Sequence, residues 1–444
     1  MDIGELREIL RNAGVAGAGG AGFPTFAKLD EKAETLILNC AECEPLLKLH
    51  RQLLRDCAQE ILEAFALVAD TVGASEGIVA VKAEYSETVD AVKKVIGHWP
   101  KLRIHELESA YPMGDEVVLI YEAAGTVVPP GGLPIQCGVA VFNVETMYNV
   151  SRAVFSAAPV TEKLVTVTGE VNNPVTVRVP IGTSLGELVR MAGGTRRSDV
   201  RLLTGGPMMG RAGRPEDPVT RTTNAVLVLP EDHILFRRMD VSMAVQLRRA
   251  ASVCCQCRMC TDLCPRHALG HPITPHLFMR SAANRDFKDV NPFLDTFFCS
   301  GCGVCEMYAC PQSLSPRTLI GAYKNGLRSA GVKAPANPAA GEVSPERDLR
   351  KVPEKRLAAR LNLAQYDHPA PIKDIPAREE RLRIRLLQHI GAPAVPAVKP
   401  GDRVRAGDVV GRPADGLSIA VHASVDGTVS EVTPAEIVII RGAE

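Results

Sequence analysis

Cysteine thiols are concentrated in one part of this sequence, at spacings that suit metal-sulfur chemistry. Nine of the 13 cysteines lie between Cys254 and Cys310. They include two runs in which the fourth cysteine is followed by proline: Cys254, Cys257, Cys260 and Cys264, then Cys299, Cys302, Cys305 and Cys310. Three thiolates with two residues between neighbours can wrap one iron-sulfur cube, and a fourth, past the proline turn, can reach a neighbouring cube. The runs therefore predict ligands for two 4Fe-4S clusters.

The first run resembles the cysteine pattern of bacterial ferredoxins, in which the fourth cysteine of each run binds the other cluster. The resemblance implies one cluster on Cys254, Cys257, Cys260 and Cys310, and another on Cys299, Cys302, Cys305 and Cys264. The second run has one extra residue before Cys310. A pair of tetrathiolate zinc sites is the alternative, although zinc ribbons rarely have this third cysteine and the Cys-Pro pair. No role is assigned to the remaining cysteines, Cys40, Cys43, Cys57, Cys137 and Cys255.

Composition excludes several classes of function. Lys plus Arg and Asp plus Glu are equal at 51 each, and 4% of residues are aromatic. A nucleic-acid partner is therefore not expected, because that surface needs excess positive charge or stacking rings. The first residues lack the pattern of a signal peptide, and no apolar run is long enough for a membrane span. We expect a cytoplasmic protein whose clustered thiols bind metal rather than form disulfides.

Five segments with different patterns indicate a multidomain α/β protein. Apolar strands alternate with amphipathic helical stretches in residues 1–158, which predicts an α/β domain with a mainly parallel sheet. Residues 159–235 contain alternating valines around a turn, and then a helix ended by Gly193-Gly194, which indicates a β-grasp module. The cysteines define a ferredoxin-like helical domain at 236–330. Residues 331–385 have few large apolar side chains and are interpreted as a linker, and 386–444 as a small β-domain.

Two polar segments of the first domain have the features of a nucleotide site. Gly17, Gly19, Gly20 and Gly22 form a loop whose backbone N–H groups can approach a phosphate. Residues 39–45, which include Asn39, Glu42 and Glu44, follow an apolar strand and so lie at the edge where open α/β sheets bind ligands. Each segment alone also fits an ordinary turn or the start of a helix.

Five motifs in sequence order resemble the RnfC-like family and, more distantly, the flavin-bearing subunit of respiratory complex I. They are Gly19 to Thr25 with Lys28, Asn39 to Pro45, Tyr111 to Glu116, Gly131 to Pro134, and Asn143 to Thr146. The resemblance implies FMN bound by Gly17, Gly19, Gly20, Gly22, Lys28, Asn39, Glu42, Tyr111, Gly114, Glu116, Asn143 and Thr146. It also implies NADH as electron donor, with Phe23 and Glu44 on the nicotinamide side. The β-grasp module, with Gly205 to Gly210, resembles the soluble-ligand-binding β-grasp (SLBB) of that family.

The order of the domains is informative. Membrane-complex RnfC proteins have a barrel-sandwich hybrid region before the flavin domain, whereas residues 389–440 here resemble that region at the other end of the chain. This order resembles the PduS-type cobalamin reductases of microcompartments that degrade propanediol. It implies a corrinoid or an adenosyltransferase as acceptor, a place inside a bacterial microcompartment, and shell proteins as candidate partners. The hairpin at Val425-Asp426-Gly427 has no lysine to carry a swinging cofactor, so a structural role is expected.

Three hypotheses for function remain open from the sequence. The leading one is a cobalamin reductase that passes electrons from NADH to FMN, then through two clusters to a corrinoid. The second is an RnfC-like electron-input subunit for another reductase or a membrane complex. The third is a non-catalytic ferredoxin-like adapter. The amphipathic segment Ile3 to Leu10 could direct the protein to a shell, but packing on its own domain is favoured.

Overall fold

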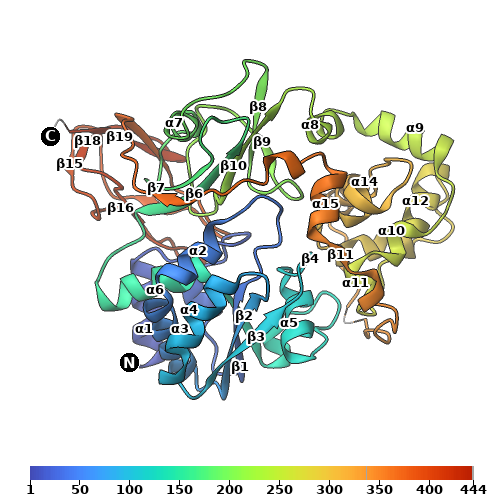
Figure 1. Ribbon diagram of the computed structural model, residues 1–444, viewed down its shortest axis with the longest axis horizontal. Helices are drawn as coiled ribbons and strands as arrows, with labels where there is room; N and C mark the ends of the chain where they lie inside the picture. The colour runs from blue at the N-terminus through green and yellow to red at the C-terminus, as the bar shows by residue number, and fades with distance from the viewer. Residues whose placement is uncertain (337, 443–444) are drawn as a thin grey trace.

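The computed structural model describes residues 1–336 and 338–442. Figure 1 shows an α/β unit, a sheet module beside it, a helical unit at the right and a small β-unit at the upper left. Residue 337 of the predicted linker and residues 443–444 of the predicted C-terminal domain lie outside the described residues. Within the described part, no helix is long and apolar enough to cross a membrane.

The first unit is a parallel four-stranded sheet in the order β3-β2-β1-β5. Alternate residues of β1 face opposite sides, so Leu36 and Leu38 pack in one core and Ile37 packs in another. This arrangement confirms the predicted α/β domain. Its strands are β1 (Thr35–Cys40), β2 (Glu76–Lys82), β3 (Leu102–Leu107) and β5 (Val139–Asn143).

Helices cover both faces of this sheet. Residues 49–72 form two helices rather than one, because the backbone at Cys57 leaves helical geometry with φ −125° and ψ 36°. Helix α5 (Glu116–Ala124) packs on the Ile37 face. The other face carries α1 (Ile3–Asn12), α2 (Leu49–Asp56), α3 (Ala58–Val72), α4 (Ser86–Val95) and α6 (Val144–Phe155).

The second unit has a six-stranded sheet in the order β12-β7-β6-β10-β8-β9, with β6 and β7 antiparallel and β10 parallel to β6. Helix α7 (Leu185–Met191) begins where the Ser184 side chain accepts a hydrogen bond from the Glu187 N–H, a typical N-cap. The hairpin and helix agree with the expected β-grasp. The strands are β6 (Glu162–Gly169), β7 (Val175–Pro180), β8 (Val200–Thr204), β9 (Arg211–Gly213), β10 (Ala225–Pro230) and β12 (Ile372–Lys373).

The cysteine-rich unit is built from short helices. Two of them start at a proline immediately after a cysteine or a threonine, where a missing N–H costs nothing. The helices are α8 (Ile234–Met239), α9 (Met243–Val253), α10 (Met259–Asp262), α11 (Pro265–Ala268), α12 (Pro275–Asn284), α13 (Asn291–Leu294) and α14 (Pro316–Ser329).

The segment interpreted as a linker is largely packed rather than free. It contains the 3-10 turn η6 (Asp348–Arg350), then β11 (Val352–Pro353), which pairs with β4 (Ala110–Tyr111) of the first unit. Helix α15 (Glu354–Arg360) follows, and then β12 extends the β-grasp sheet. We call residues 348–373 the strap. In Figure 1 it runs in orange from the helical unit back toward the C-terminal unit.

A few apolar side chains are enough to pack the strap against the other units. For this reason the composition of residues 331–385 wrongly indicated a linker. Leu357, Leu361 and Leu363 are fully buried, in one core with Met208 of the β-grasp and Met307 of the cluster unit. Each buried leucine contributes roughly 1.5 to 3 kcal/mol relative to exposure. The strap therefore joins three units.

The C-terminal unit is two small antiparallel sheets around a core of its own. Its first strand lies before the expected boundary at 386, so that boundary is corrected to residue 381. The unit also contacts the glycine loop, because the Ile390 N–H donates to the Gly22 carbonyl at 3.1 Å. Its strands are β13 (Arg381–Arg385), β14 (Val395–Pro396), β15 (Arg403–Val404), β16 (Val409–Arg412), β17 (Val421–His422), β18 (Gly427–Val432) and β19 (Glu436–Arg441).

Candidate redox site

The ligand cysteines lie around two separate cavities. One is lined by Cys254, Cys257, Cys260 and Cys310, together with the extra thiol Cys255. The other is lined by Cys264, Cys299, Cys302 and Cys305. We call them the first and second cluster cavities. This grouping is the crossed pairing that the ferredoxin pattern implied.

The extra residue before Cys310 is accommodated by a π-helix. Residues Cys305–Ala309 adopt this wider turn, which absorbs a one-residue insertion within a helix. Cys310 follows it in extended geometry and still lines the first cluster cavity. The longer spacing thus leaves the position of the fourth ligand intact.

Burial keeps these thiols protonated unless positive charge is supplied. Burial, with a smaller contribution from neighbouring cysteines, raises the pKa of Cys260, Cys264 and Cys302 to about 12 each. Iron provides the positive charge that a thiolate ligand needs. The four thiols around each cavity fit a cluster, whose ligands surround a cube rather than one ion. Among the described residues, no three His, Cys, Asp or Glu side chains converge at the spacing of a single metal ion.

The predicted flavin residues meet at the carboxyl ends of β1 and β5. Asn39 and Asn143 are register partners in these adjacent parallel strands. The chain reverses its direction of strand addition between β1 and β5, and such switch points are where open α/β sheets bind ligands. The glycine loop comes to the same place, since the Ala18 N–H donates to the Thr146 hydroxyl at 3.0 Å.

The glycine loop has one crowded side and one open side. A Cβ at Gly19 would lie 2.4 Å from the Asn143 amide nitrogen, so a side chain is excluded there. A Cβ at Gly20 would meet no described atom within 4 Å, so this side of the loop is open. Phe23 is 40% exposed beside it, and Lys28 pairs with Glu116 at 2.7 Å. Backbone donors, a cation and an open face together fit FMN.

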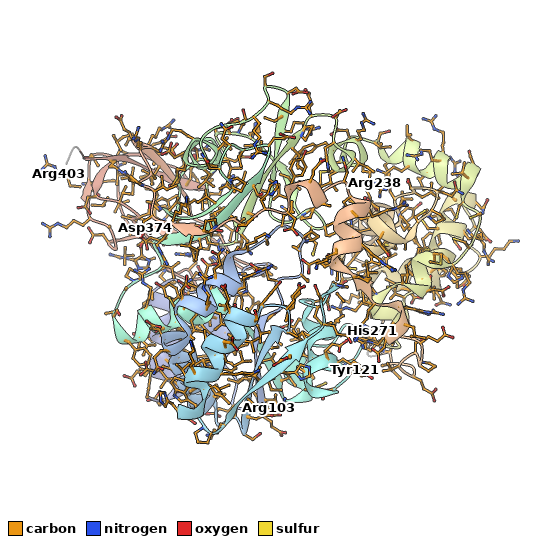
Figure 2. The ribbon with its side chains drawn as sticks, in the orientation of Figure 1. Arg103, Tyr121, Arg238, His271, Asp374 and Arg403 are labelled. Carbon is orange, nitrogen blue, oxygen red and sulfur yellow. The ribbon has the colours of Figure 1, made fainter. Side chains whose placement is uncertain are left out.

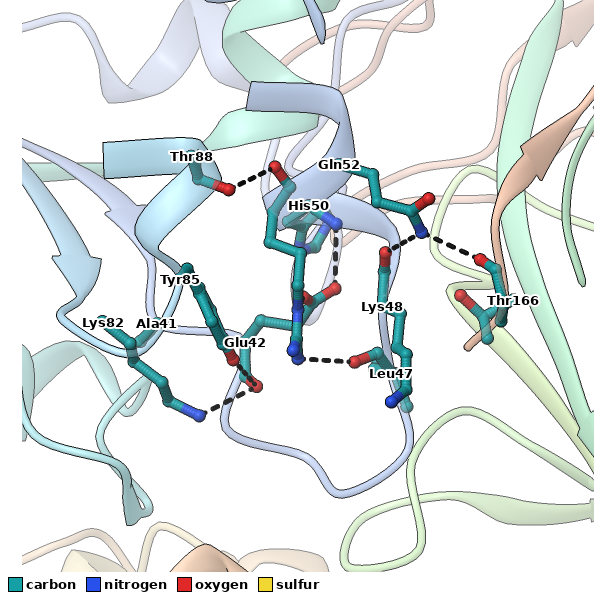
Figure 3. Close-up of polar contacts among 12 residues, drawn as sticks. Ala41, Glu42, Leu47, Lys48, His50, Gln52, Lys82, Tyr85, Thr88 and Thr166 are labelled. Atoms are coloured by element: carbon teal, nitrogen blue, oxygen red, sulfur yellow. Dashed lines mark hydrogen bonds and ion pairs between the residues drawn. The ribbon is translucent and has the colours of Figure 1, made fainter. Parts of the chain in front are cut away.

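Glu42 is held by hydrogen bonds within its own domain. Its carboxylate accepts hydrogen bonds from the His50 N–H at 2.8 Å and from Arg51 at 2.7 Å. Burial would raise the pKa of Glu42, but the positive charge of Arg51 prevails and lowers it. Figure 3 shows this network, with Lys82 and Tyr85 directed at the Glu42 carbonyl. Glu42 therefore fixes the shape of the 39–45 loop.

Glu44 and Tyr111 link the flavin domain to other units. A Glu44 carboxylate oxygen accepts from the Met208 N–H of the β-grasp at 2.8 Å. Burial raises the pKa of Glu44 to about 7. The Tyr111 hydroxyl donates to the Cys302 carbonyl at 2.6 Å, next to the second cluster cavity. These residues join domains in this structure, where the sequence predicted contacts with NADH and FMN.

Sequence reasoning missed several residues that hold the domains together. Arg266, two residues after the ligand Cys264, pairs with Asp115 of the flavin domain at 2.8 Å. Its place beside a Cys-Pro pair is the one local signal that could have indicated it. Within the flavin domain, Cys43 accepts a hydrogen bond from the Gly114 N–H at 3.2 Å. Figure 2 shows Tyr121 and His271 in the same border region, where His271 bonds to the Val128 carbonyl at 3.0 Å.

Four family models match the chain in the expected order. They are the Nuo51 FMN-binding domain at residues 10–152, the SLBB domain at 164–212, the 4Fe-4S dicluster domain at 253–315 and the RnfC barrel sandwich hybrid domain at 364–444. The predicted fold class is thereby confirmed. FMN and two 4Fe-4S clusters are the cofactors of these domains, and the dicluster match contradicts the zinc alternative.

Full-length relatives decide the family. The chain is 40% identical to the cobalamin reductase PduS of Citrobacter freundii, over 99% of this chain and 97% of that protein. It is 41% identical to the cobalamin reductase PduS of Salmonella typhimurium, over 100% and 98%. The chain belongs to the PduS family. A component of the Na(+)-translocating ferredoxin:NAD(+) oxidoreductase complex of Acetobacterium woodii is 31% identical, over 60% of this PduS-family chain and 59% of that component.

Proposed function

We propose that this protein is an NADH-oxidising flavo-iron-sulfur enzyme that reduces the cobalt of a corrinoid. The observation that carries the proposal is identity of 40% or more to two cobalamin reductases along essentially the whole chain. The contact between Tyr111 and Cys302 supports it, because the flavin domain touches the wall of a cluster cavity.

The chain's own residues would bind and orient rather than transfer protons. We propose that the Gly17 to Gly22 loop, Lys28, Asn143 and Thr146 hold FMN. Phe23 then borders the nicotinamide. When bound, the flavin would accept the two electrons of a hydride together and pass them on one at a time. Glu42 shapes the loop through Arg51, and Glu44 sets the position of the β-grasp through Met208.

Partners and location are a finer part of the proposal. Reduced cobalt is easily reoxidised, so direct delivery to an adenosyltransferase inside a bacterial microcompartment would protect it. Helix α1 is poorly suited to shell targeting, because Leu6 and Leu10 are fully buried in its own domain. A shell contact would therefore need another surface.

The test is anaerobic purification with analysis of iron, sulfide and flavin, followed by addition of NADH and of cob(III)alamin or cob(II)alamin. We expect both clusters, FMN and corrinoid reduction. Oxidation of NADH with artificial acceptors but with neither corrinoid would overturn the proposal. A stable complex with a different reductase would then favour the RnfC-like input subunit, which the relative from Acetobacterium woodii suggests. Clusters without flavin, even after incubation with FMN, would favour the adapter.

A further inference from the structure

The two cluster cavities have different surroundings. The second is buried at Cys264 and Cys305 and touches the flavin domain through Cys302. The first has Cys255 and Cys257 exposed at its edge. Because tunnelling requires short distances, the second cavity is the natural entry from the flavin and the first is the natural exit.

A separate polar cavity adjoins this exit. It has a volume of about 390 Å³ and is lined by Cys257, Arg258, Asp262, His267, Ser344 and Arg350. Cys257 and Arg258 line both this cavity and the first cluster cavity. A group bound here would therefore lie against a ligand of the exposed cluster. We call it the exit pocket.

Two guanidinium groups give the exit pocket its chemistry. Arg258 has a side chain 59% exposed, and its carboxylate partner, Asp262, is 3.7 Å away. Arg350 lies 3.5 Å from the same carboxylate and also pairs with Glu346. Asp262 is thus shared between two cations. Planar guanidinium groups around an open cavity are suited to a phosphate oxygen.

We propose that the exit pocket binds the phosphodiester of the nucleotide loop of the corrinoid, and so holds the corrin ring beside Cys257. This inference rests on the proposed function and adds where the corrinoid docks. A sugar phosphate can enter a cavity of this size, and the corrin ring is placed at its mouth. A phosphodiester carries one negative charge at neutral pH, and that charge competes with Asp262 for Arg258 and Arg350.

The experiment compares hydroxocobalamin with cobinamide, a corrinoid that lacks the nucleotide loop and its phosphodiester. Binding to the oxidised, cluster-loaded protein is measured without NADH by ultrafiltration and absorbance. R350Q, in the strap and remote in sequence from the ligands, should raise the Kd for hydroxocobalamin roughly five- to tenfold. Its Kd for cobinamide should stay unchanged. R258Q should have the same effect on the two Kd values. Its iron and sulfide content shows whether the clusters are intact.

Two further variants sharpen the result. D262N removes the competing charge and should lower the Kd for hydroxocobalamin alone. R214Q is the matched control, because Arg214 is an arginine with a side chain 76% exposed beside two carboxylates on the β-grasp. It should change neither Kd.

The outcomes separate the two proposals. A parent protein that binds and reduces both corrinoids, while R350Q shifts both Kd values equally or neither, overturns the docking site and leaves corrinoid reduction standing. A parent protein that reduces no corrinoid overturns the proposed function, and the docking site with it.

Discussion

Residue spacing carried the cluster assignment, because ligand spacing is a local property. The four-cysteine patterns that end in Cys264-Pro265 and Cys310-Pro311 can be recognised without knowledge of the tertiary structure. The contact of Tyr111 with Cys302 could not be predicted, since these residues are 191 positions apart. Glu44 illustrates the same limit. Its motif is recognisable, yet its carboxylate bonds to Met208, 164 positions away.

Loss of single ligands should identify which cysteines share a cluster. C310S removes a predicted ligand that lines the first cavity, and C264S removes one that lines the second. Each should lower iron and acid-labile sulfide by about half, because one of two cubes loses a ligand. C137S, at a cysteine outside both cavities, is the control and should keep full content. Equal loss of both clusters in C264S would contradict the assignment.

The buried Glu44 carboxyl predicts a pH-dependent stability. Its pKa in the folded protein, about 7, lies above the ordinary 4.5, so the folded state holds the proton more tightly. The stabilisation of the folded protein by the protonated Glu44 carboxyl is complete below about pH 4.5 and is lost as the pH rises through 7. E44Q should therefore be more stable than the parent at pH 8, by roughly 1 to 3 kcal/mol, and similar to it near pH 4.5. Urea unfolding at both pH values measures this difference, and an equal gain at both would contradict it.

At the scale of elements, periodic patterns predicted the strands and helices of the first two units. Prediction from the sequence failed for the strap, where only a few residues determine the packing. The strap is fixed by Leu357, Leu361 and Leu363 and by short pairings with β4 and β7. Those pairings have no local signature, because two-residue strands show no alternation.

The strap should depend on one ion pair. Lys82 of β2 is fully buried and pairs with Glu354, the first residue of α15. E354A leaves that ammonium unpaired and should lower the free energy of unfolding by about 3 to 5 kcal/mol. K82M/E354L replaces both charges and should recover most of this loss. Denaturant unfolding measures all three proteins. Equal destabilisation of the single and double variants would show that the pair is not the cause.

At the scale of the whole molecule, the arrangement of the units agrees with the proposed order of electron transfer, from the flavin through the second cavity to the first. The flavin domain contacts the second cavity through Tyr111 and Asp115, whereas the first cavity faces solvent at Cys257. C310S should therefore still allow NADH to reduce the remaining cluster but should abolish corrinoid reduction. Visible spectra under anaerobic conditions follow the first step, and cobalt spectra follow the second. Unchanged corrinoid reduction in C310S would contradict this order.

The contact between α1 and the C-terminal unit bears on the difference in domain order that the resemblance to RnfC proteins implied. The Ala420 N–H donates to the Arg11 carbonyl at 3.0 Å, and the Arg11 guanidinium donates to the Ala414 carbonyl at 2.6 Å. These contacts form between two folded units, so they do not depend on which unit comes first in the sequence. Transposition of the barrel-sandwich module from one end of the reading frame to the other can therefore preserve the same neighbours, provided that a strap of sufficient reach accompanies it.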